Sequence, residues 1–344
     1  LFSTLLLSLT ACIFILKFYR LAEYGVDMPG QLLVSLSIIL ISIILFNNFS
    51  DELKIRYYYL SLYLIIFAVT TKLIYSIYFI IPIIMGLKLF GVRKLCSLLI
   101  EYKFLFLSIF SALVFIFYNF TYSGCFIYPV EKTCFFYELE WTLSEETILH
   151  LNLHYEAWAK GGIGAGYKLD DIENYVNSFN WFENWFRNYF FTKFSDYILV
   201  ILIVSLIFYL ISSKKKVTKL FSKKIKINII FFYLSICFVF LIWFFNFPTL
   251  RYAGYSISFY LIILPICFII SKYDIPNEKK YYNKIKIIFI ICLIIFNVRN
   301  IDRINKKLEL DQNSNHNFTN FPFYWTKDVN YSRKNINNYE VSFL

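Results

Sequence analysis

The short segment 246–255 carries Arg251, the side chain best suited to bind an anion. The segment reads Asn-Phe-Pro-Thr-Leu-Arg-Tyr-Ala-Gly-Tyr and lies between two long apolar stretches. If those stretches cross a membrane, the guanidinium at its surface can bind a phosphate or pyrophosphate through two parallel hydrogen bonds. The same side chain could instead anchor a helix by reaching the lipid headgroups. Both interpretations stay open, because ionisable groups at membrane level are functional candidates.

Two carboxylates, Glu23 and Asp27, lie with Arg20 in a second polar segment between apolar stretches. A carboxylate in such a place can take a proton from a hydroxyl nucleophile, while Arg251 stabilises a leaving phosphate. We therefore name Glu23 and Asp27 as candidate catalytic acids. We expect them to face the same pocket as Arg251.

Two histidines share one face of a predicted helix with Glu146. Glu146, His150 and His154 are spaced four residues apart, which places them on one side of a helix. A zincin site would need a glutamate directly after the first histidine, and Leu151 stands there instead. We predict no metal site and no cofactor, although a divalent metal is left open. His150 and His154 are expected either to form a solvated face or to line a polar pocket with Tyr255.

Cys125 and Cys134 flank a short run in the segment that we place outside the membrane. An oxidising compartment favours a disulfide between them, and two reduced thiols are the alternative. The other five cysteines lie in or beside apolar stretches, where they are interpreted as small apolar residues. The chain contains no Ser/His/Asp set and no CxxC motif. The glycine-rich run 161–166 is interpreted as a hinge, since no strand precedes it and no Lys-Ser/Thr follows it.

These residues must be positioned by membrane-spanning helices. The 344 residues are 59% hydrophobic with a mean hydropathy of +0.58, and the excess collects in blocks long enough to cross about 30 Å of hydrocarbon. We predict an all-α, polytopic membrane protein with about nine transmembrane helices and a break at Lys72. The predicted spans are Leu1–Phe18, Met28–Phe46, Tyr57–Thr71, Leu73–Phe90, Phe104–Phe120, Phe194–Ser212, Asn228–Phe245, Ser256–Ser271 and Ile285–Val298.

The distribution of charge predicts the orientation of these helices. The net charge is +11, and the lysines cluster in segments such as 214–226 and 272–286, each bracketed by spans. Basic loops face the cytoplasm, so the fragment starts inside and the segment 121–193, with ten acids against five bases, faces the periplasm. The positive charge is thus assigned to membrane lipids and not to nucleic acid. The expected location is the bacterial inner (plasma) membrane.

The sequence divides into four predicted parts. Residues 1–120 hold the first five spans, 121–193 a mostly helical periplasmic domain, 194–298 the last four spans, and 299–344 an outer tail. In the periplasmic domain a capping box from Thr142 to Glu145 predicts a helix that ends at Gly161. A second helix starts at Asp170, carries Trp181 and Trp185 at the membrane boundary, and leads into the next span.

Several motifs resemble those of a known group of proteins. They are Ser123-Gly-Cys-Phe-Ile-Tyr-Pro129, Trp141, Glu156-Ala-Trp-Ala-Lys160, Asn180-Trp-Phe-Glu-Asn-Trp-Phe186, Leu250-Arg-Tyr-Ala-Gly254 and Ala22-Glu-Tyr-Gly-Val-Asp-Met-Pro-Gly-Gln31. Together they resemble an uncharacterised family of bacterial envelope proteins, which is in turn similar to glycosyltransferases of the C fold. The resemblance implies a polyprenyl-phosphate sugar as donor. It also implies a catalytic acid in the first outer loop of the complete protein.

The chain opens at Leu1 inside an apolar run, so we expect it to be a fragment whose upstream part holds that acid. The predicted function is transfer of a sugar from a lipid-phosphate donor in cell-envelope glycan assembly. The expected partners are membrane lipids and a polyprenyl-phosphate sugar or other lipid-linked glycan. The alternatives are an O-antigen polymerase or ligase, and a non-enzymatic flippase or transporter. A transporter should show inverted repeats and charges within its spans, and neither is evident.

Overall fold

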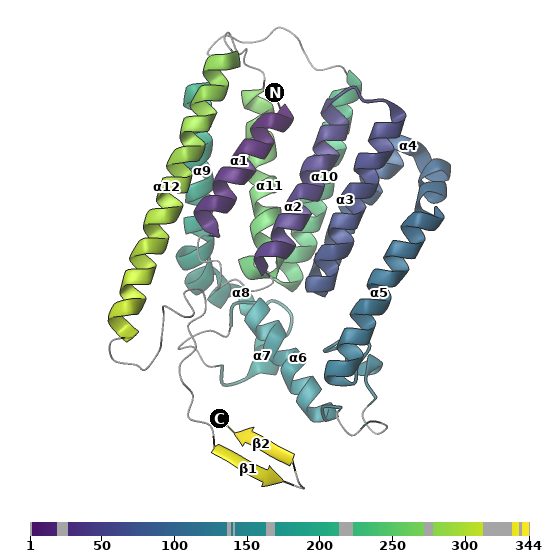
Figure 1. Ribbon diagram of the computed structural model, residues 1–344, viewed down its shortest axis with the longest axis vertical. Helices are drawn as coiled ribbons and strands as arrows, with labels where there is room; N and C mark the ends of the chain where they lie inside the picture. Colours follow the sequence, from purple (N-terminus) through teal and green to yellow (C-terminus); the bar gives the residue numbers. More distant parts are fainter. Residues whose placement is uncertain are drawn as a thin grey trace.

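The structure is a bundle of long helices with a small group of short helices at one end (Figure 1). This computed structural model describes residues 2–18, 27–135, 139, 142–162, 169–212, 223–271, 278–311, 332–336 and 339–343. The long helices are α1 (Phe2–Lys17), α2 (Asp27–Phe46), α3 (Asp51–Thr71), α4 (Ile80–Leu99), α5 (Tyr102–Ser123), α9 (Ser195–Ile211), α10 (Lys223–Asn246), α11 (Tyr255–Ile270) and α12 (Glu278–Asp311).

Shorter elements connect these helices or lie beyond them. The 3-10 helices are η1 (Leu73–Phe79) and η2 (Glu131–Thr133), and the π-helices are η3 (Trp185–Phe194) and η4 (Leu250–Gly254). The short α-helices are α6 (Glu145–Ala159), α7 (Ile172–Val176) and α8 (Trp181–Asn184). The two antiparallel strands β1 (Ser332–Ile336) and β2 (Tyr339–Phe343) form a hairpin. We call the end of the bundle next to α6–α8 the α6 end.

Seven helical segments in the described part of the chain are long and apolar enough to cross a membrane. They are Asp27–Phe46, Asp51–Thr71, Leu73–Leu99, Tyr102–Ser123, Trp181–Ile211, Ile227–Asn246 and Leu250–Ile270. Seven of the nine predicted spans coincide with these segments. The other two coincide with α1, a shorter apolar helix of 16 residues, and with the middle of α12, a helix of 34 residues. The chain is therefore a helical multi-pass membrane protein.

Polar side chains join α2 to α11 in the centre of the bundle. Gln31 donates from Nε2 to the carbonyl oxygen of Leu250 over 2.9 Å, and its Oε1 accepts from the backbone N–H of Ser256 over 2.8 Å. The hydroxyls of Ser35 and Ser256 are 2.9 Å apart. Small polar residues let two helices approach closely within a membrane. These bonds fix the start of α11, and with it η4, against the start of α2.

The predicted break at Lys72 is present. Lys72 has an extended backbone (φ −155°, ψ 129°) between the end of α3 and η1. The hydroxyls of Thr70 and Thr71 bond back to the carbonyls of Phe67 and Ala68, which satisfies acceptors at the end of the helix. The chain thus reverses at the α6 end and does not continue as one long helix.

The structure divides the second predicted periplasmic helix into separate pieces. α7 has only five residues, and the chain turns at Ser178 (φ +51°) before helix resumes at Trp181. Asn180 stabilises this turn by donating to the backbone carbonyl and the side-chain oxygen of Asn174. The prediction of one continuous helix is wrong because these local side-chain bonds compete with the helical ladder.

Trp181 and Trp185 lie inside the protein and do not face lipid. Both indoles are buried, and each contacts the ring of Phe244 on α10. Trp185 donates from its indole N–H to the carbonyl oxygen of Pro248 over 2.8 Å. These two tryptophans, predicted to lie at the membrane boundary, therefore pack the α6 end against α10 and the loop before η4.

A disulfide joins Cys125 to Cys134 directly after α5. The two residues also pair as an isolated bridge, and Phe126 donates its N–H to the carbonyl oxygen of Thr133 over 3.0 Å. The first turn of this loop is stabilised by Gly124, whose positive φ of 72° ends α5.

We expect Cys125 and Cys134 to resist alkylation in protein that is denatured without a reductant. Mass spectrometry after iodoacetamide treatment should then find modification at the other five cysteines of the chain, and at all seven after reduction. The exposed thiol of Cys96 serves as the internal control for reagent access. Modification of both Cys125 and Cys134 in the unreduced sample would contradict the bridge.

Candidate functional site

Asp27 forms ion pairs with two cations at the α6 end of the bundle. Its carboxylate oxygen Oδ2 accepts from Arg251 Nε over 2.9 Å, and Oδ1 accepts from Lys72 Nζ. The carboxylate is only 1% exposed, whereas the side chains of Lys72 and Arg251 are 29% and 49% exposed. One negative charge thus holds two positive charges that both remain accessible from outside.

Three segments far apart in the sequence bring these side chains together. Asp27 is the first residue of α2, where a negative charge is favoured by the helix dipole. Lys72 occupies the extended link between α3 and η1, and Arg251 lies in η4. Two residues after Arg251, Ala253 has a positive φ of 65°. This irregular backbone turns the chain into α11.

Tyrosine hydroxyls hold the backbone around these charges. Tyr75 donates to the carbonyl oxygen of Asp27 over 3.1 Å, and Tyr78 donates to the carbonyl oxygen of Ala253 over 2.6 Å. Tyr189 accepts from the N–H of Leu250 over 2.8 Å. Buried backbone polar groups need hydrogen-bond partners. These bonds therefore stabilise the irregular turn inside the protein and fix the position of the Arg251 backbone.

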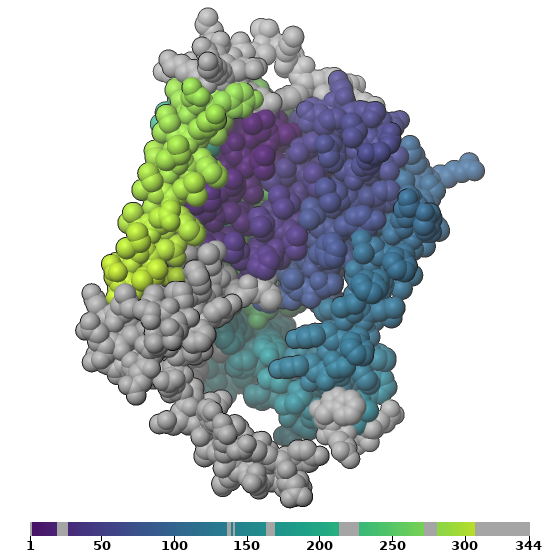
Figure 2. Space-filling model, viewed as in Figure 1, coloured from purple at the N-terminus to yellow at the C-terminus, as the bar shows by residue number. Residues whose placement is uncertain are grey.

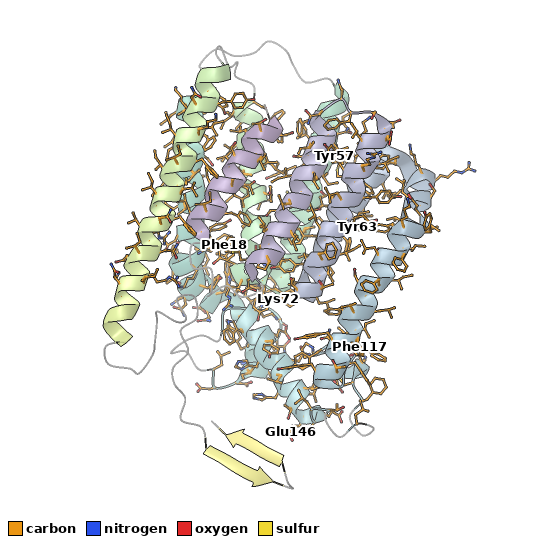
Figure 3. The ribbon with its side chains drawn as sticks, viewed as in Figure 1. Phe18, Tyr57, Tyr63, Lys72, Phe117 and Glu146 are labelled. Carbon is orange, nitrogen blue, oxygen red and sulfur yellow. A yellow bond between two sulfur atoms is a disulfide. The ribbon has the colours of Figure 1, made fainter. Side chains whose placement is uncertain are left out.

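A cavity of about 860 Å³ opens beside Lys72 between the bundle and α6. Figure 2 shows this face hollowed between the long helices and α6, and Figure 3 shows Lys72 at that boundary. Lys72 Nζ also lies 5.0 Å from the centre of the Tyr252 ring. The lining residues are Thr70, Thr71, Lys72, Leu73, Ile74, Ser76, Ile77, Phe115, Tyr118, Asn119, Tyr128, Pro129, Val130, Asn152, Tyr155, Glu156, Asn246, Phe247 and Tyr252.

The wall opposite Lys72 is polar and comes from α6 and the disulfide loop. Asn152, Tyr155 and Glu156 line it, spaced as one face of a helix. Burial, and then a hydrogen bond with Tyr155, raise the pKa of Tyr128 to about 12. The Tyr128 phenol is therefore neutral at pH 7 and can take part in hydrogen bonding at the cavity wall.

The structure unites two of the sequence-predicted residues and separates the others. Asp27 and Arg251 meet, as expected, while Glu23 lies outside the described residues. His150 is exposed, and His154 packs its ring against Trp158. Neither histidine lines the cavity, because the face of α6 that does so is the one carrying Tyr155.

Tyr255 is not at the cavity either. It is buried in the first turn of α11, where its ring contacts Phe18 and its carbonyl oxygen accepts from Tyr197. Among the described residues, no group of three or more His, Cys, Asp or Glu side chains could hold a metal ion.

Sequence reasoning missed Lys72 and Glu156 as site residues. The sequence marks Lys72 only as a break between spans, although a single lysine at the end predicted to face the periplasm departs from the positive-inside rule. That departure was the signal that could have identified it. Glu156 stands on the predicted periplasmic helix two residues after His154, and only the packing of α6 shows which face meets the bundle.

The shared carboxylate predicts a large stability difference between two carboxylate deletions. Asp27→Ala leaves two cations without their partner and should lower the free energy of unfolding by about 3 kcal/mol, the lower end for a buried pair because both cations are partly exposed. Glu52→Ala removes an exposed i,i+4 partner of Arg56 and should cost less than about 1 kcal/mol. Thermal unfolding of both purified variants in the same detergent measures the difference. Equal Tm values would show that Asp27 does not organise this end.

Comparison with known proteins places most of the chain in one family. No curated protein and no solved structure matches it. Residues 3–258 match the model of a family described as "Domain of unknown function (DUF8201)". This match includes Asp27, Lys72 and Arg251 and ends in the first turn of α11. The chain is a member of this DUF8201 family.

Proposed function

We propose that the protein is a membrane glycosyltransferase-like enzyme that takes a sugar from a lipid-phosphate donor at the cavity beside Lys72. The observation that carries this proposal is the meeting of Lys72 and Arg251 on the buried carboxylate of Asp27, next to an 860 Å³ cavity at the end of the membrane helices. Two cations against one carboxylate leave one positive charge to attract a phosphate.

The guanidinium of Arg251 suits this role. It donates to Asp27 through Nε, its one hydrogen bond within the described part of the chain, so the two terminal nitrogens can still donate to an anion. A planar guanidinium held at one edge offers a fixed geometry to phosphate oxygens. Asp27 thus acts in this proposal as a positioning residue, because its carboxylate is buried and both of its oxygens already accept hydrogen bonds.

The cavity has the size and surface that a sugar phosphate requires. Its volume falls within the usual range of small-molecule sites, about 300–1,000 Å³. Tyr252 and Tyr118 supply aromatic surface, and Asn152 supplies an amide. α5 borders the cavity and exposes apolar side chains along its length, including Phe117 (Figure 3). A prenyl chain can therefore lie along α5 while its phosphate reaches Lys72.

Glu156 is the one carboxylate among the described residues that line this cavity. In the proposed reaction an acceptor hydroxyl attacks the first carbon of the sugar and gives its proton to a carboxylate. The bond from that carbon to the phosphate oxygen breaks as the new bond forms. Lys72 and Arg251 stabilise the charge on the departing phosphate. We assign the proton acceptor to Glu156, whose carboxylate forms an ion pair with Lys160 Nζ at 2.7 Å.

The orientation proposed with this function has nine spans, with the α6 end in the periplasm of a bacterium and the opposite end in the cytoplasm. α1 and α12 add to the seven long apolar segments. The helices alternate in direction along the chain (Figure 1). Residues Lys54, Arg56, Arg93 and Lys94 all lie at the end opposite α6, as the positive-inside rule requires.

Reporter fusions test this orientation. An alkaline phosphatase fused after Gly162 should be active, and one fused after Lys216 should be inactive, because the first reporter works only outside the cytoplasm. A fluorescent protein that matures only in the cytoplasm should give the reverse result. The same readout at both positions would contradict the nine-span topology.

Replacement of Arg251 by lysine tests the phosphate role. Arg251→Lys keeps the charge and loses the planar fork, so affinity for undecaprenyl phosphate should fall about tenfold while Tm changes little. Binding is measured in detergent by tryptophan fluorescence, with undecaprenol as the matched ligand without phosphate. Arg187→Lys, at an exposed ion pair with Glu183, is the control and should bind like the wild type. Unchanged affinity in Arg251→Lys, or equal binding of undecaprenol, would reject the proposed function.

A further inference from the structure

A second cavity lies at the end of the bundle opposite α6. It measures about 420 Å³ and is formed by the end of α2, the start of α3, the middle of α4 and the start of α10. The lining residues are Ile44, Leu45, Asn47, Asn48, Asp51, Lys54, Lys88, Leu89, Phe90, Lys94 and Asn228. It shares no residue with the cavity beside Lys72, so the two sites are independent.

This second cavity carries more positive than negative charge. Three lysines line it against one aspartate, and only Lys54 pairs with that aspartate, at 3.1 Å from Asp51. Lys88 and Lys94 have no carboxylate within 4 Å in the part of the chain that the structure describes. Lys88 Nζ lies instead 4.5 Å from the centre of the Phe231 ring. The cavity therefore has three lysines against one aspartate, and two of those lysines form no ion pair within the described part of the chain.

A bend in α4 brings those two lysines to the same cavity. Lys88 and Lys94 are six residues apart, which on a regular helix would point their side chains about 120° apart. Gly91 interrupts α4 with a positive φ of 77° and ψ of 165°, a conformation that side chains rarely tolerate. No other heavy atom lies within 4 Å of the place where a side chain would start at Gly91. The glycine is thus required by the bend and not by crowding.

The rest of the lining combines an apolar wall with polar amide groups, as a site for a phospholipid requires. Ile44, Leu45, Leu89 and Phe90 form an apolar wall that continues the bundle. Amide groups of Asn47, Asn48 and the buried Asn228 add hydrogen-bond capacity at the rim and floor. A soluble anion would use the lysines and amides but would leave the apolar wall in contact with water. A phospholipid uses both surfaces, with its phosphate on the lysines and its glycerol and first acyl carbons on the wall.

We propose that this cavity binds the headgroup of an anionic phospholipid, with Lys88 and Lys94 on the phosphate and Leu89 and Phe90 against the glycerol backbone. The site needs no particular chemistry at the α6 end and stands whether or not the proposed sugar transfer is correct. Basic pockets between membrane helices are known to bind the headgroups of acidic lipids, and this cavity resembles them in its positive charge and in its position at the end of the bundle.

Thermal unfolding in a non-ionic detergent tests this site. The protein in dodecyl maltoside is titrated with dioleoylphosphatidylglycerol, with dioleoylphosphatidylcholine of identical chains, and with sodium phosphate. The anionic lipid should raise Tm at the lowest concentration, because a ligand of the folded state alone stabilises it. Equal response to the choline lipid would overturn recognition of the anionic headgroup. An equal rise in Tm with sodium phosphate would overturn the proposal of a lipid site and would assign the cavity to a soluble phosphate.

Paired variants separate this site from general attraction to basic surfaces. Lys88→Gln with Lys94→Gln should weaken the response to the anionic lipid roughly thirtyfold, since each lysine near a membrane surface contributes about fivefold. Lys88→Arg with Lys94→Arg should keep it. Arg93→Gln with Lys103→Gln removes the same charge from neighbouring residues that do not line the cavity and should respond like the wild type. Equal loss in both charge-removing pairs would overturn the site, as would no loss in either.

Discussion

The ion pairs of Asp27 with Lys72 and Arg251 are the interaction on which the α6 end of the structure depends. They join the start of α2, the link after α3 and the turn before α11, three segments that are far apart in the sequence. The Asp27 carboxylate is 1% exposed, and removing either partner of a buried ion pair is strongly destabilising. The same pairing fixes Lys72 at the edge of a cavity and Arg251 beside it. Stability and the candidate site therefore rest on one side chain.

Around these charges, aromatic side chains form hydrogen bonds with the backbone groups that lack helical partners. Tyr75, Tyr78, Tyr189 and Trp185 each bond a backbone group of the segments that carry Asp27 and Arg251. Non-helical backbone at membrane depth is tolerated only where it is enclosed by protein or lines a cavity. The hydroxyl and indole groups supply the enclosure here. The high aromatic content, 22% of the residues, thus has a specific use at this end in addition to facing lipid.

The two ends of the bundle handle positive charge in different ways. At the α6 end Asp27 holds two cations in place and leaves one charge in excess. At the opposite end Lys88 and Lys94 lie on either side of the bend at Gly91, and neither forms an ion pair with a described residue, because the one carboxylate of the cavity, Asp51, pairs with Lys54. The first arrangement suits a site that must hold its cations rigidly beside a substrate. The second suits the proposed headgroup site, where lysines that are not held in ion pairs can bind the phosphate of an acidic lipid.

The sequence by itself determined the membrane architecture, because blocks of apolar residues long enough to cross a bilayer have no other stable environment. It also determined the break at Lys72, and it correctly brought Asp27 and Arg251 to one site, since both lie in short polar segments at the same end of neighbouring spans. Only the tertiary structure decided that Lys72 completes the site and that Glu156, not His150 or His154, faces the cavity. Spacing along α6 defines its faces but not which face packs against the bundle. Local bonds from Asn180 to Asn174 interrupt the helix predicted after Asp170. Trp185 is buried and not at the membrane boundary, because it packs against α10 and the loop before η4, which are distant in sequence.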